Sequence, residues 1–142
     1  MLISGDARAE LIRGVALFSD ADGGLIESLA AIATEVEFPA ERTIARQGEP
    51  GNGMFVVVRG RVRVVRDGRP VATLGPGEWF GELAVLDRGP RIASVVADEP
   101  TVCLAIAAWD AEQLFLEQPA LAVGLLRTMA ARMRSATKDP RH

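Results

Sequence analysis

The sequence has very few of the residues that hold metals, clusters or disulfides. It contains one cysteine, Cys103, and one histidine, His142, at its last position. A disulfide within the chain needs two cysteines, and iron–sulfur, haem and most zinc sites need cysteine or histidine ligands in the interior. An interior Ser-His-Asp or Cys-His pair has no histidine to use. We therefore expect a protein that is not an enzyme and that has no metal and no cofactor.

Long apolar runs and a basic balance are missing as well. No uninterrupted apolar stretch approaches the roughly 20 residues that span a bilayer, and Asp6, Arg8 and Glu10 argue against a signal peptide. The formal net charge is -3, which does not indicate a basic nucleic-acid surface. We expect a soluble cytoplasmic protein that binds no membrane and, by this chain alone, no nucleic acid.

The residues that are present suit one domain with its own core. The chain has 142 residues, 49% of them hydrophobic and 25% charged, which is ordinary for a folded domain. Apolar residues at helical spacing predict an N-terminal helical part over residues 6–33 and C-terminal helices over residues 108–135. Pro119 marks the start of the last helix, at a favoured first-turn position. That helix carries a stripe of apolar residues, Leu121, Leu125, Met129 and Met133.

The middle of the chain has the period of β-strands. From Met54 to Val65, Val58, Val62 and Val64 share one parity, and Arg59, Arg61 and Arg63 share the other. The arginine row is interpreted as a solvated strand face. Asp67-Gly68 is typical of a tight hairpin turn, and residues 91–97 and 101–107 are predicted as two further strands. About eight short strands over residues 34–107 predict a mainly β, α+β fold built on an antiparallel jelly roll or barrel.

One stretch, FGELAVLDRGPRIASV over residues 80–95, places Glu82 and Arg91 in an apolar neighbourhood. A structural ion pair remains one interpretation. The other is a phosphate site: a short helix from Gly81 offers unpaired N–H groups to an anion, and the turn over residues 87–90 returns Arg91 above them. An arginine fork suits phosphate, and a carboxylate suits sugar hydroxyls. With no P-loop lysine and no acidic pair for magnesium, the pattern favours a nucleotide with a single phosphate.

This stretch resembles the phosphate-binding cassette of the cyclic nucleotide-binding domain family. The matching residues are Gly-Glu-Leu-Ala, a spacer, Pro-Arg, one residue, and Ala-Ser. LIRGVALFSD resembles the N-terminal helical motif of the family, QGEPGNGMFVVVRGRVRV resembles its third and fourth strands, and the closing helices occupy the place of its B and C helices. The resemblance covers roughly residues 8–135, and it implies one domain over residues 1–142.

The resemblance implies a role for each matching position. Arg91 would pair with the cyclic phosphate, and Glu82 would accept a hydrogen bond from the ribose 2′-hydroxyl. The other predicted ligand-binding residues are the amides of Gly81, Leu83 and Ala84, the base-packing Val64 and Ala72, and Arg132 of the last helix. Arg127, Met129 or Met133 are alternatives to Arg132, whose other interpretation is a solvated helix arginine. Ile92 stands where many members carry Ser, Thr or Ala, and it offers no hydroxyl to guanine, which favours cyclic AMP over cyclic GMP.

We therefore expect a cyclic nucleotide sensor whose terminal helix responds to the ligand and acts on an effector protein or domain not visible in the sequence. A homodimer through the C-terminal helices is compatible with their apolar stripe, which could equally face the barrel. A metal-dependent jelly-roll enzyme of the cupin kind would need two or three interior histidines. A ligand-free domain that acts as a protein-interaction scaffold is the remaining alternative, and the presence of both Glu82 and Arg91 speaks against it.

Overall fold

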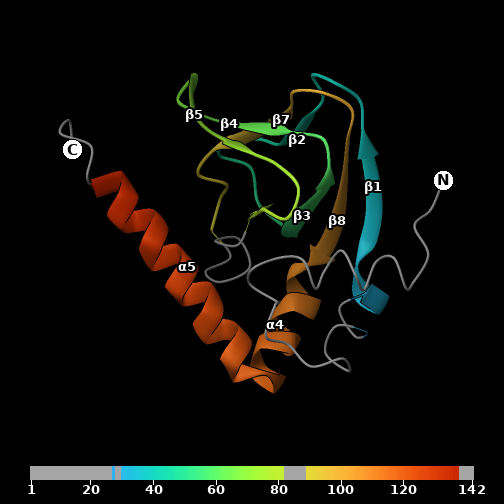
Figure 1. The fold of residues 1–142 in the computed structure, drawn as a ribbon, viewed down its shortest axis with the longest axis vertical. Coiled ribbons are helices and arrows are strands. Elements are labelled where there is room, and N and C mark those ends of the chain that lie inside the picture. Colours follow the sequence, from blue (N-terminus) through green and yellow to red (C-terminus); the bar gives the residue numbers. More distant parts are fainter. Residues whose placement is uncertain (1–26, 28–29, 82–88, 138–142) are drawn as a thin grey trace.

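The computed structural model describes residue 27, residues 30–81 and residues 89–137, which form a β-sandwich followed by two helices (Figure 1). The strands are β1 Thr34–Phe38, β2 Thr43–Ala45, β3 Gly53–Arg59, β4 Val62–Arg66, β5 Arg69–Leu74, β6 Trp79–Phe80, β7 Ser94–Ala97 and β8 Thr101–Ala107. The helices are α4 Ala108–Glu117 and α5 Pro119–Thr137. The predicted mainly β fold with eight antiparallel strands and C-terminal helices is confirmed. Residues 30–32 are helical, and the rest of the predicted N-terminal helical part lies almost wholly outside the described residues.

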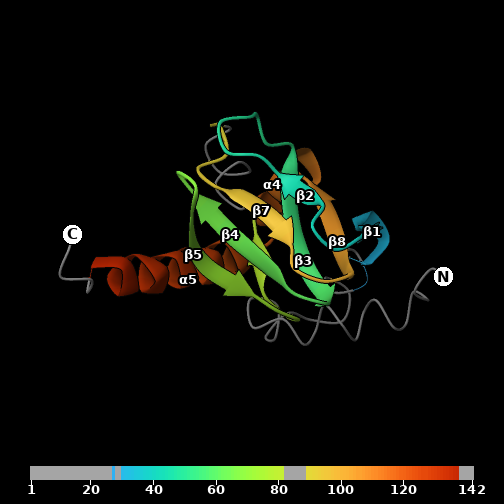
Figure 2. The same cartoon turned by 90° about the horizontal axis from the view of Figure 1, so that it is seen from above.

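The strands form two four-stranded antiparallel sheets. The first has the order β1-β8-β3-β6, and the second has the order β2-β7-β4-β5. Figures 1 and 2 show the sheets facing each other, with α4 below the sandwich and α5 extending beyond it on the side of β5. Between the sheets lies an inner core that includes Val57, Val62, Phe80, Val95 and Cys103. The outer face of the first sheet packs against the helices in a second, larger cluster.

β3 is buried on both faces, which explains its unbroken apolar sequence. Met54, Val56 and Val58 belong to the cluster beneath the helices, whereas Val57 belongs to the inner core and Phe55 packs against it. A strand with an apolar environment on each side has no polar face, so its residues do not alternate in polarity. β3 is therefore the wall that separates the inner core from the helices.

The third and fourth strands implied by the resemblance are confirmed as β3 and β4. The alternation from Met54 to Val65 does not belong to one strand, because the chain turns at Gly60. This glycine has φ +93°, a conformation that side chains with a Cβ rarely adopt. A Cβ at Gly60 would also lie 2.6 Å from the carbonyl oxygen of Pro100. Val58 consequently packs beneath the helices, while Val62 and Val64 face the other core.

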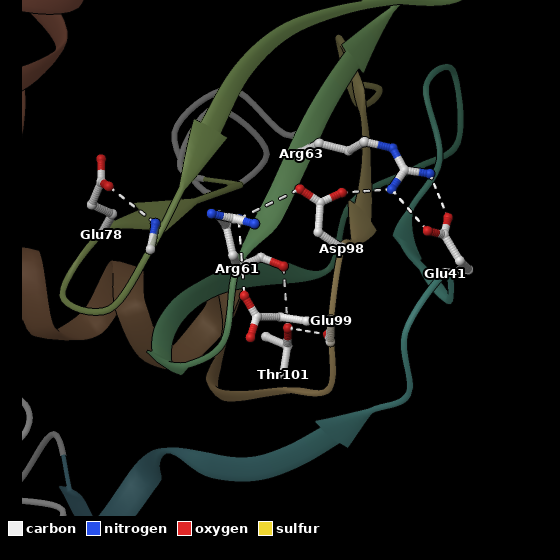
Figure 3. A network of polar contacts seen from close by, with 8 residues as sticks. Glu41, Arg61, Arg63, Glu78, Asp98, Glu99 and Thr101 are labelled. Carbon is white, nitrogen blue, oxygen red and sulfur yellow. Dashed lines mark hydrogen bonds and ion pairs between the residues drawn. The ribbon is translucent and has the colours of Figure 1, made fainter.

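Arg61, just before β4, and Arg63 within it are paired with acids from two neighbouring turns (Figure 3). Arg63 Nη1 donates to Asp98 Oδ1 at 2.6 Å, and Arg63 Nη2 donates to Glu41 Oε2 at 2.6 Å. Arg61 Nε lies 3.8 Å from Asp98 Oδ2. The hydrogen bonds to both acids raise the pKa of Arg63 above its ordinary value. The expected solvated arginine face is therefore a clamp for Arg61 and Arg63, joining β4 to the β1–β2 and β7–β8 turns.

The two helices follow β8 with one short break. α4 begins directly after β8, and Pro119 is the first residue of α5, as predicted. Leu121 and Leu125 are buried and Met129 packs against the same cluster, so this part of the apolar stripe faces the sandwich. Met133, in contrast, is 69% exposed. Neither described helix is both long and apolar enough to cross a membrane.

Candidate ligand-binding site

The backbone of Arg91 is fixed by the loop between β2 and β3. Its N–H donates to the carbonyl oxygen of Glu49 at 2.9 Å, and its own carbonyl accepts from the N–H of Gly48 at 2.8 Å. Pro90 and Pro50 form an isolated antiparallel bridge beside this pair. Arg91 therefore pairs with the β2–β3 loop and is not part of β7, which begins at Ser94. The predicted strand over residues 91–97 is therefore wrong for its first three residues.

The side chain of Arg91 lies against the start of β3. Arg91 Nη2 donates to the carbonyl oxygen of Gly53 at 3.1 Å, and its guanidinium carbon is 5.9 Å from the centroid of the Phe55 ring. Gly53 is itself buried, and a Cβ there would meet the backbone of β8, with Ala107 Cα at 3.1 Å. The half-buried guanidinium is thus held by a carbonyl and an aromatic face, in a low-dielectric setting that strengthens its attraction for an anion.

Gly81 follows β6 and lies directly against Arg91. Its φ is +88°, and a Cβ at this position would clash with Arg91 Nη1 and lie 2.9 Å from the carbonyl oxygen of Gly53. Both the backbone conformation and the space require glycine here. The cassette residues Gly81 and Arg91 are therefore neighbours in space, whereas most of the predicted turn before Arg91 lies outside the described residues.

The predicted residues Glu82, Leu83 and Ala84 lie outside the described part of the chain. The ring of amides around a phosphate, and the approach of Glu82 to a sugar hydroxyl, both stay predictions. Among the described cassette residues, Gly81 and Arg91 both lie beside Gly53, at the start of β3.

Val64 and Ala72, the residues predicted to pack on a base, are directly paired across β4 and β5. Val64 packs against the inner core, and Ala72 is exposed. The next pair in this ladder joins Val65 to Pro70, so Val71 is an extra residue in β5. This β-bulge leaves the Val71 side chain 58% exposed, and bulges often re-aim side chains near binding sites. Our sequence analysis missed it, although Pro70 was a usable signal because proline within strands is confined to edges and bulges.

Ile92 is also exposed, at 52%, and it follows Arg91 outside any strand. The nearby hydroxyl of Ser94 is engaged, since Ser94 Oγ accepts a hydrogen bond from the N–H of Gln47 at 2.9 Å. The apolar side chain of Ile92 is therefore presented to solvent, directly after Arg91 in the chain.

Arg132, the residue predicted to reach a base, lies on the outer face of β6. Its guanidinium carbon is 4.2 Å from the centroid of the Trp79 ring, and Arg132 Nη2 donates to the Trp79 carbonyl oxygen at 3.1 Å. Trp79 is only 3% exposed, and it belongs to the cluster beneath the helices. A contact between Arg132 and a base stays a prediction, and the contact with Trp79 was not foreseen.

A cavity of about 530 Å³ borders Arg91 on the side of β2 and β8. Its described lining combines apolar residues such as Ile44, Phe55 and Ala105 with the charged side chains of Arg46, Glu49 and Asp110. Val64 and Ala72 are not among these described lining residues, since they lie on β4 and β5, at the other end of the second sheet from β2. The cavity and the predicted base-packing residues are thus two separate regions, and each borders the cassette.

Metal chemistry finds no support in the described side chains. In residues 27, 30–81 and 89–137, no three His, Cys, Asp or Glu residues come together to hold an ion. Cys103 has no measurable exposure, and burial raises the pKa of its thiol to about 12. A buried neutral thiol behaves as a small apolar group and is a poor nucleophile.

Comparison with known proteins shows the family of the chain. The cyclic nucleotide-binding domain family model matches residues 35–118. Over 135 residues the chain is 28% identical to a CRP-like cAMP-activated global transcriptional regulator of Mycobacterium tuberculosis, covering 92% of this chain and 60% of the relative. It is 39% identical over 104 residues to a cyclic AMP receptor protein of Thermus thermophilus, covering 70% of this chain and 48% of the relative.

Among solved structures, the catabolite activator protein of Thermus thermophilus superposes with a TM-score of 0.80 at 34% identity. The superposition covers 87% of this chain and 60% of that one. The chain therefore spans about 60% or less of the length of these relatives. The family match extends over more than half of the chain and includes β1 to β8 and α4. The chain belongs to the cyclic nucleotide-binding domain family.

Proposed function

We propose that this chain is a regulatory module that binds cyclic AMP in preference to cyclic GMP and transmits binding through α5. The observation that carries the proposal is the placement of Arg91, which lies against a glycine of positive φ and is held by a carbonyl and an aromatic ring. Family membership supports the same ligand class. The names of two relatives, a cAMP-activated regulator and a cyclic AMP receptor protein, support the choice of cyclic AMP.

In this proposal each cassette residue has one task. Arg91 pairs with the cyclic phosphate through two parallel N–H groups, the arrangement in which arginine binds phosphate best. Glu82 accepts from the ribose 2′-hydroxyl, and the amides of Gly81, Leu83 and Ala84 surround the phosphate and sugar. Because a carboxylate repels phosphate, Glu82 belongs on the sugar side.

The base lies against apolar side chains. Val64 and Ala72, paired across β4 and β5, form the wall for a purine, and the exposed Ile92 follows Arg91 in the chain. Ile92 offers no hydrogen bond to a guanine, and Ser94 Oγ already accepts from Gln47. A site without the required donors and acceptors discriminates against the base that needs them, which favours adenine.

The output of the module is the position of α5, and a second copy of this chain is the partner we propose for it. Val123, Leu126, Ala130 and Met133 are exposed and recur at alternating spacings of three and four residues, the pattern of a coiled-coil seam. This seam lies on a different side of α5 from the buried Leu121 and Leu125. The downstream effector and a cytoplasmic location belong to the same proposal.

Calorimetric titration of the purified chain with cyclic AMP and cyclic GMP tests the proposal. We expect tighter binding of cyclic AMP, and loss of that binding in Arg91→Ala. Arg42→Ala is the matched control, because Arg42 is exposed and lies in the β1–β2 turn. That turn pairs with Ala97, at the opposite end of β7 from Arg91. If neither nucleotide releases heat nor shifts the melting temperature, the ligand-free scaffold becomes the better explanation.

A further inference from the structure

A continuous set of contacts joins Arg91 to α5. The guanidinium of Arg91 lies 5.9 Å from the Phe55 ring centroid, and the Phe55 ring stacks on Phe80 with centroids 5.1 Å apart and planes 15° from parallel. Phe80 is followed by Gly81 and preceded by Trp79, on which Arg132 of α5 lies at 4.2 Å. The path therefore runs from the predicted phosphate contact to the helix through three aromatic residues.

β6 carries this path from one side of the first sheet to the other. It has only two residues, and successive side chains of a strand point to opposite faces. Phe80 faces the inner core, at 5% exposure, and Trp79 faces the cluster beneath the helices, at 3% exposure. Both pair with β3, Phe80 with Phe55 and Trp79 with Val56. Because both side chains are closely packed, a displacement at Gly81 moves Phe80 and Trp79 together.

Arg132 contacts the sandwich in the second half of α5, beyond Met129. The first half is packed by Leu121 and Leu125, whereas Ala130, Ala131 and Met133 are exposed. Arg132 is half-buried among these exposed neighbours. It gives the Trp79 residue both a cation–π contact and a hydrogen bond. A cation over tryptophan is the strongest pairing of this type, and it gains strength where water is excluded.

We propose that Arg132 is a positioning residue that couples α5 to the cassette through Trp79, and that it does so in place of a contact with the base. The inference rests on the proposed function, because the cyclic phosphate is what draws Arg91 away from Gly53 and Phe55. Nucleotide binding then shifts the balance between α5 held on β6 and α5 released from it. The element with two states is the Arg132–Trp79 contact, which is either formed or broken, and both the nucleotide and the position of α5 shift its equilibrium.

The first experiment tests the contact in solution by fluorescence. The chain has two tryptophans, and Trp109 is 66% exposed, so Trp109→Phe leaves the buried Trp79 as the only reporter. We expect cyclic AMP to change the emission of this single-tryptophan protein. In that background Arg132→Met removes the charge and the donor but keeps an apolar side chain, and we expect it to change the resting emission. Arg127→Met is the control, because Arg127 is an exposed arginine of the same helix.

The second experiment measures the position of α5 and the affinity in the same proteins. Spin labels at Arg42→Cys and Ser135→Cys, both exposed positions, report the distance between the sandwich and the end of α5, while the buried Cys103 stays unlabelled. We expect cyclic AMP to shift this distance in the parent and in Arg127→Met, but not in Arg132→Met. The dissociation constant of Arg132→Met should change by about fivefold, the low end of coupling between sites, with the preference for cyclic AMP over cyclic GMP unchanged. Arg132→Lys keeps a cation and a donor, and should restore part of the distance shift.

Two results would overturn the inference while leaving the proposed function intact. One is a distance shift in Arg132→Met equal to that of the parent. The other is a loss of affinity of about tenfold or more together with a changed preference between cyclic AMP and cyclic GMP, which indicates a direct base contact. If the parent itself binds neither nucleotide, the proposed function fails and the inference fails with it. Should Arg132→Met not fold, Arg132→Lys and Trp79→Phe weaken the contact with smaller changes. Arg132→Lys then gives all three readouts, and Trp79→Phe, which removes the fluorescent reporter, gives the distance and the affinity.

Discussion

Gly81 and Arg91 share a space that only a glycine leaves free. A Cβ at Gly81 would clash with Arg91 Nη1, and the backbone there has φ +88°. Gly81→Ala should therefore displace the guanidinium and lower the affinity for cyclic AMP by about tenfold or more, as expected when a charged hydrogen bond worth 1.5–3 kcal/mol is lost. Calorimetry of the variant measures the change.

Gly68→Ala separates the clash from the backbone strain. Gly68 has φ +78°, and nothing lies within 4 Å of a Cβ placed there. Both substitutions carry the left-handed penalty of roughly 1–2 kcal/mol in stability, but only Gly81→Ala should lower the affinity. Equal affinity in the two variants would mean that Gly81 does not position Arg91.

The clamp on Arg63 should depend more on Asp98 than on Glu41. Asp98 is the more enclosed acid, with a side chain 26% exposed against 67% for Glu41, and exposed ion pairs contribute little. Asp98→Asn should lower the melting temperature by more than Glu41→Gln, as measured by circular dichroism. Added salt should reduce the effect of Glu41→Gln first, because exposed pairs are screened most. The reverse order would show that the β1–β2 turn is the stronger anchor.

Cys103 should give the domain an alkaline limit to its stability. Burial raises its pKa to about 12, whereas a thiol in the unfolded chain titrates near about 8.5. Above that pH the unfolded chain loses this proton while the folded chain keeps it. The free energy of unfolding therefore falls as pH rises, by at most about 1.4 kcal/mol per pH unit until the folded pKa is reached. Below pH 8 the thiol contributes no slope.

This slope is measurable because few other groups titrate in the same range. The sequence has no tyrosine, and Lys138 is its only lysine. Urea unfolding at several pH values between 8 and 11 should show the decline in the parent. Cys103→Ala should be less stable at every pH, because it leaves a small cavity, but its stability should stay nearly flat. An equally steep decline in Cys103→Ala would assign the slope to another group.

Leu126→Glu should separate two copies of the chain. Leu126 is 57% exposed in the middle of the α5 seam, and a buried unpaired charge at a coiled-coil core position is strongly unfavourable. Sedimentation should find a dimer for the parent and a monomer for the variant. Leu116→Glu is the control, because Leu116 is 69% exposed but lies on α4, outside the seam. A parent that is monomeric at all concentrations would exclude this dimer.

The sequence analysis predicted the fold class well because its signals are local. The strand pattern, the Asp67-Gly68 turn and the Pro119 helix start all depend on neighbours in the chain, and the structure has each of them. The break at Gly60 was missed because part of its cause is distant. Gly60 passes against Pro100 of the β7–β8 turn and Thr101 at the start of β8, and a valine-rich alternation on both sides conceals the change of sheet.

The candidate site also has features that local sequence signals predicted and features that depend on distant segments. The proximity of Gly81 and Arg91 was predicted from a turn within the cassette. The positions of Gly53 and Phe55 beneath the guanidinium, and of Trp79 beneath Arg132, depend on strand pairing between distant segments. Spacing alone could place Met133 in the same apolar stripe as Leu121, but only packing shows that the Met133 side chain is exposed.

Because β3 is buried on both faces, only one strand separates the inner core beside Arg91 from the cluster beneath the helices. Phe55 and Val56 are consecutive residues, yet the first lies beneath Arg91 and the second belongs to the cluster that α4 and α5 cover. The proposed coupling between the Arg91 face of β3 and the face covered by the helices therefore crosses one layer of backbone, and packed layers are about 10 Å apart. The two sides are opposite faces of one peptide strand, so the proposed coupling needs no change elsewhere than in the residues packed on β3.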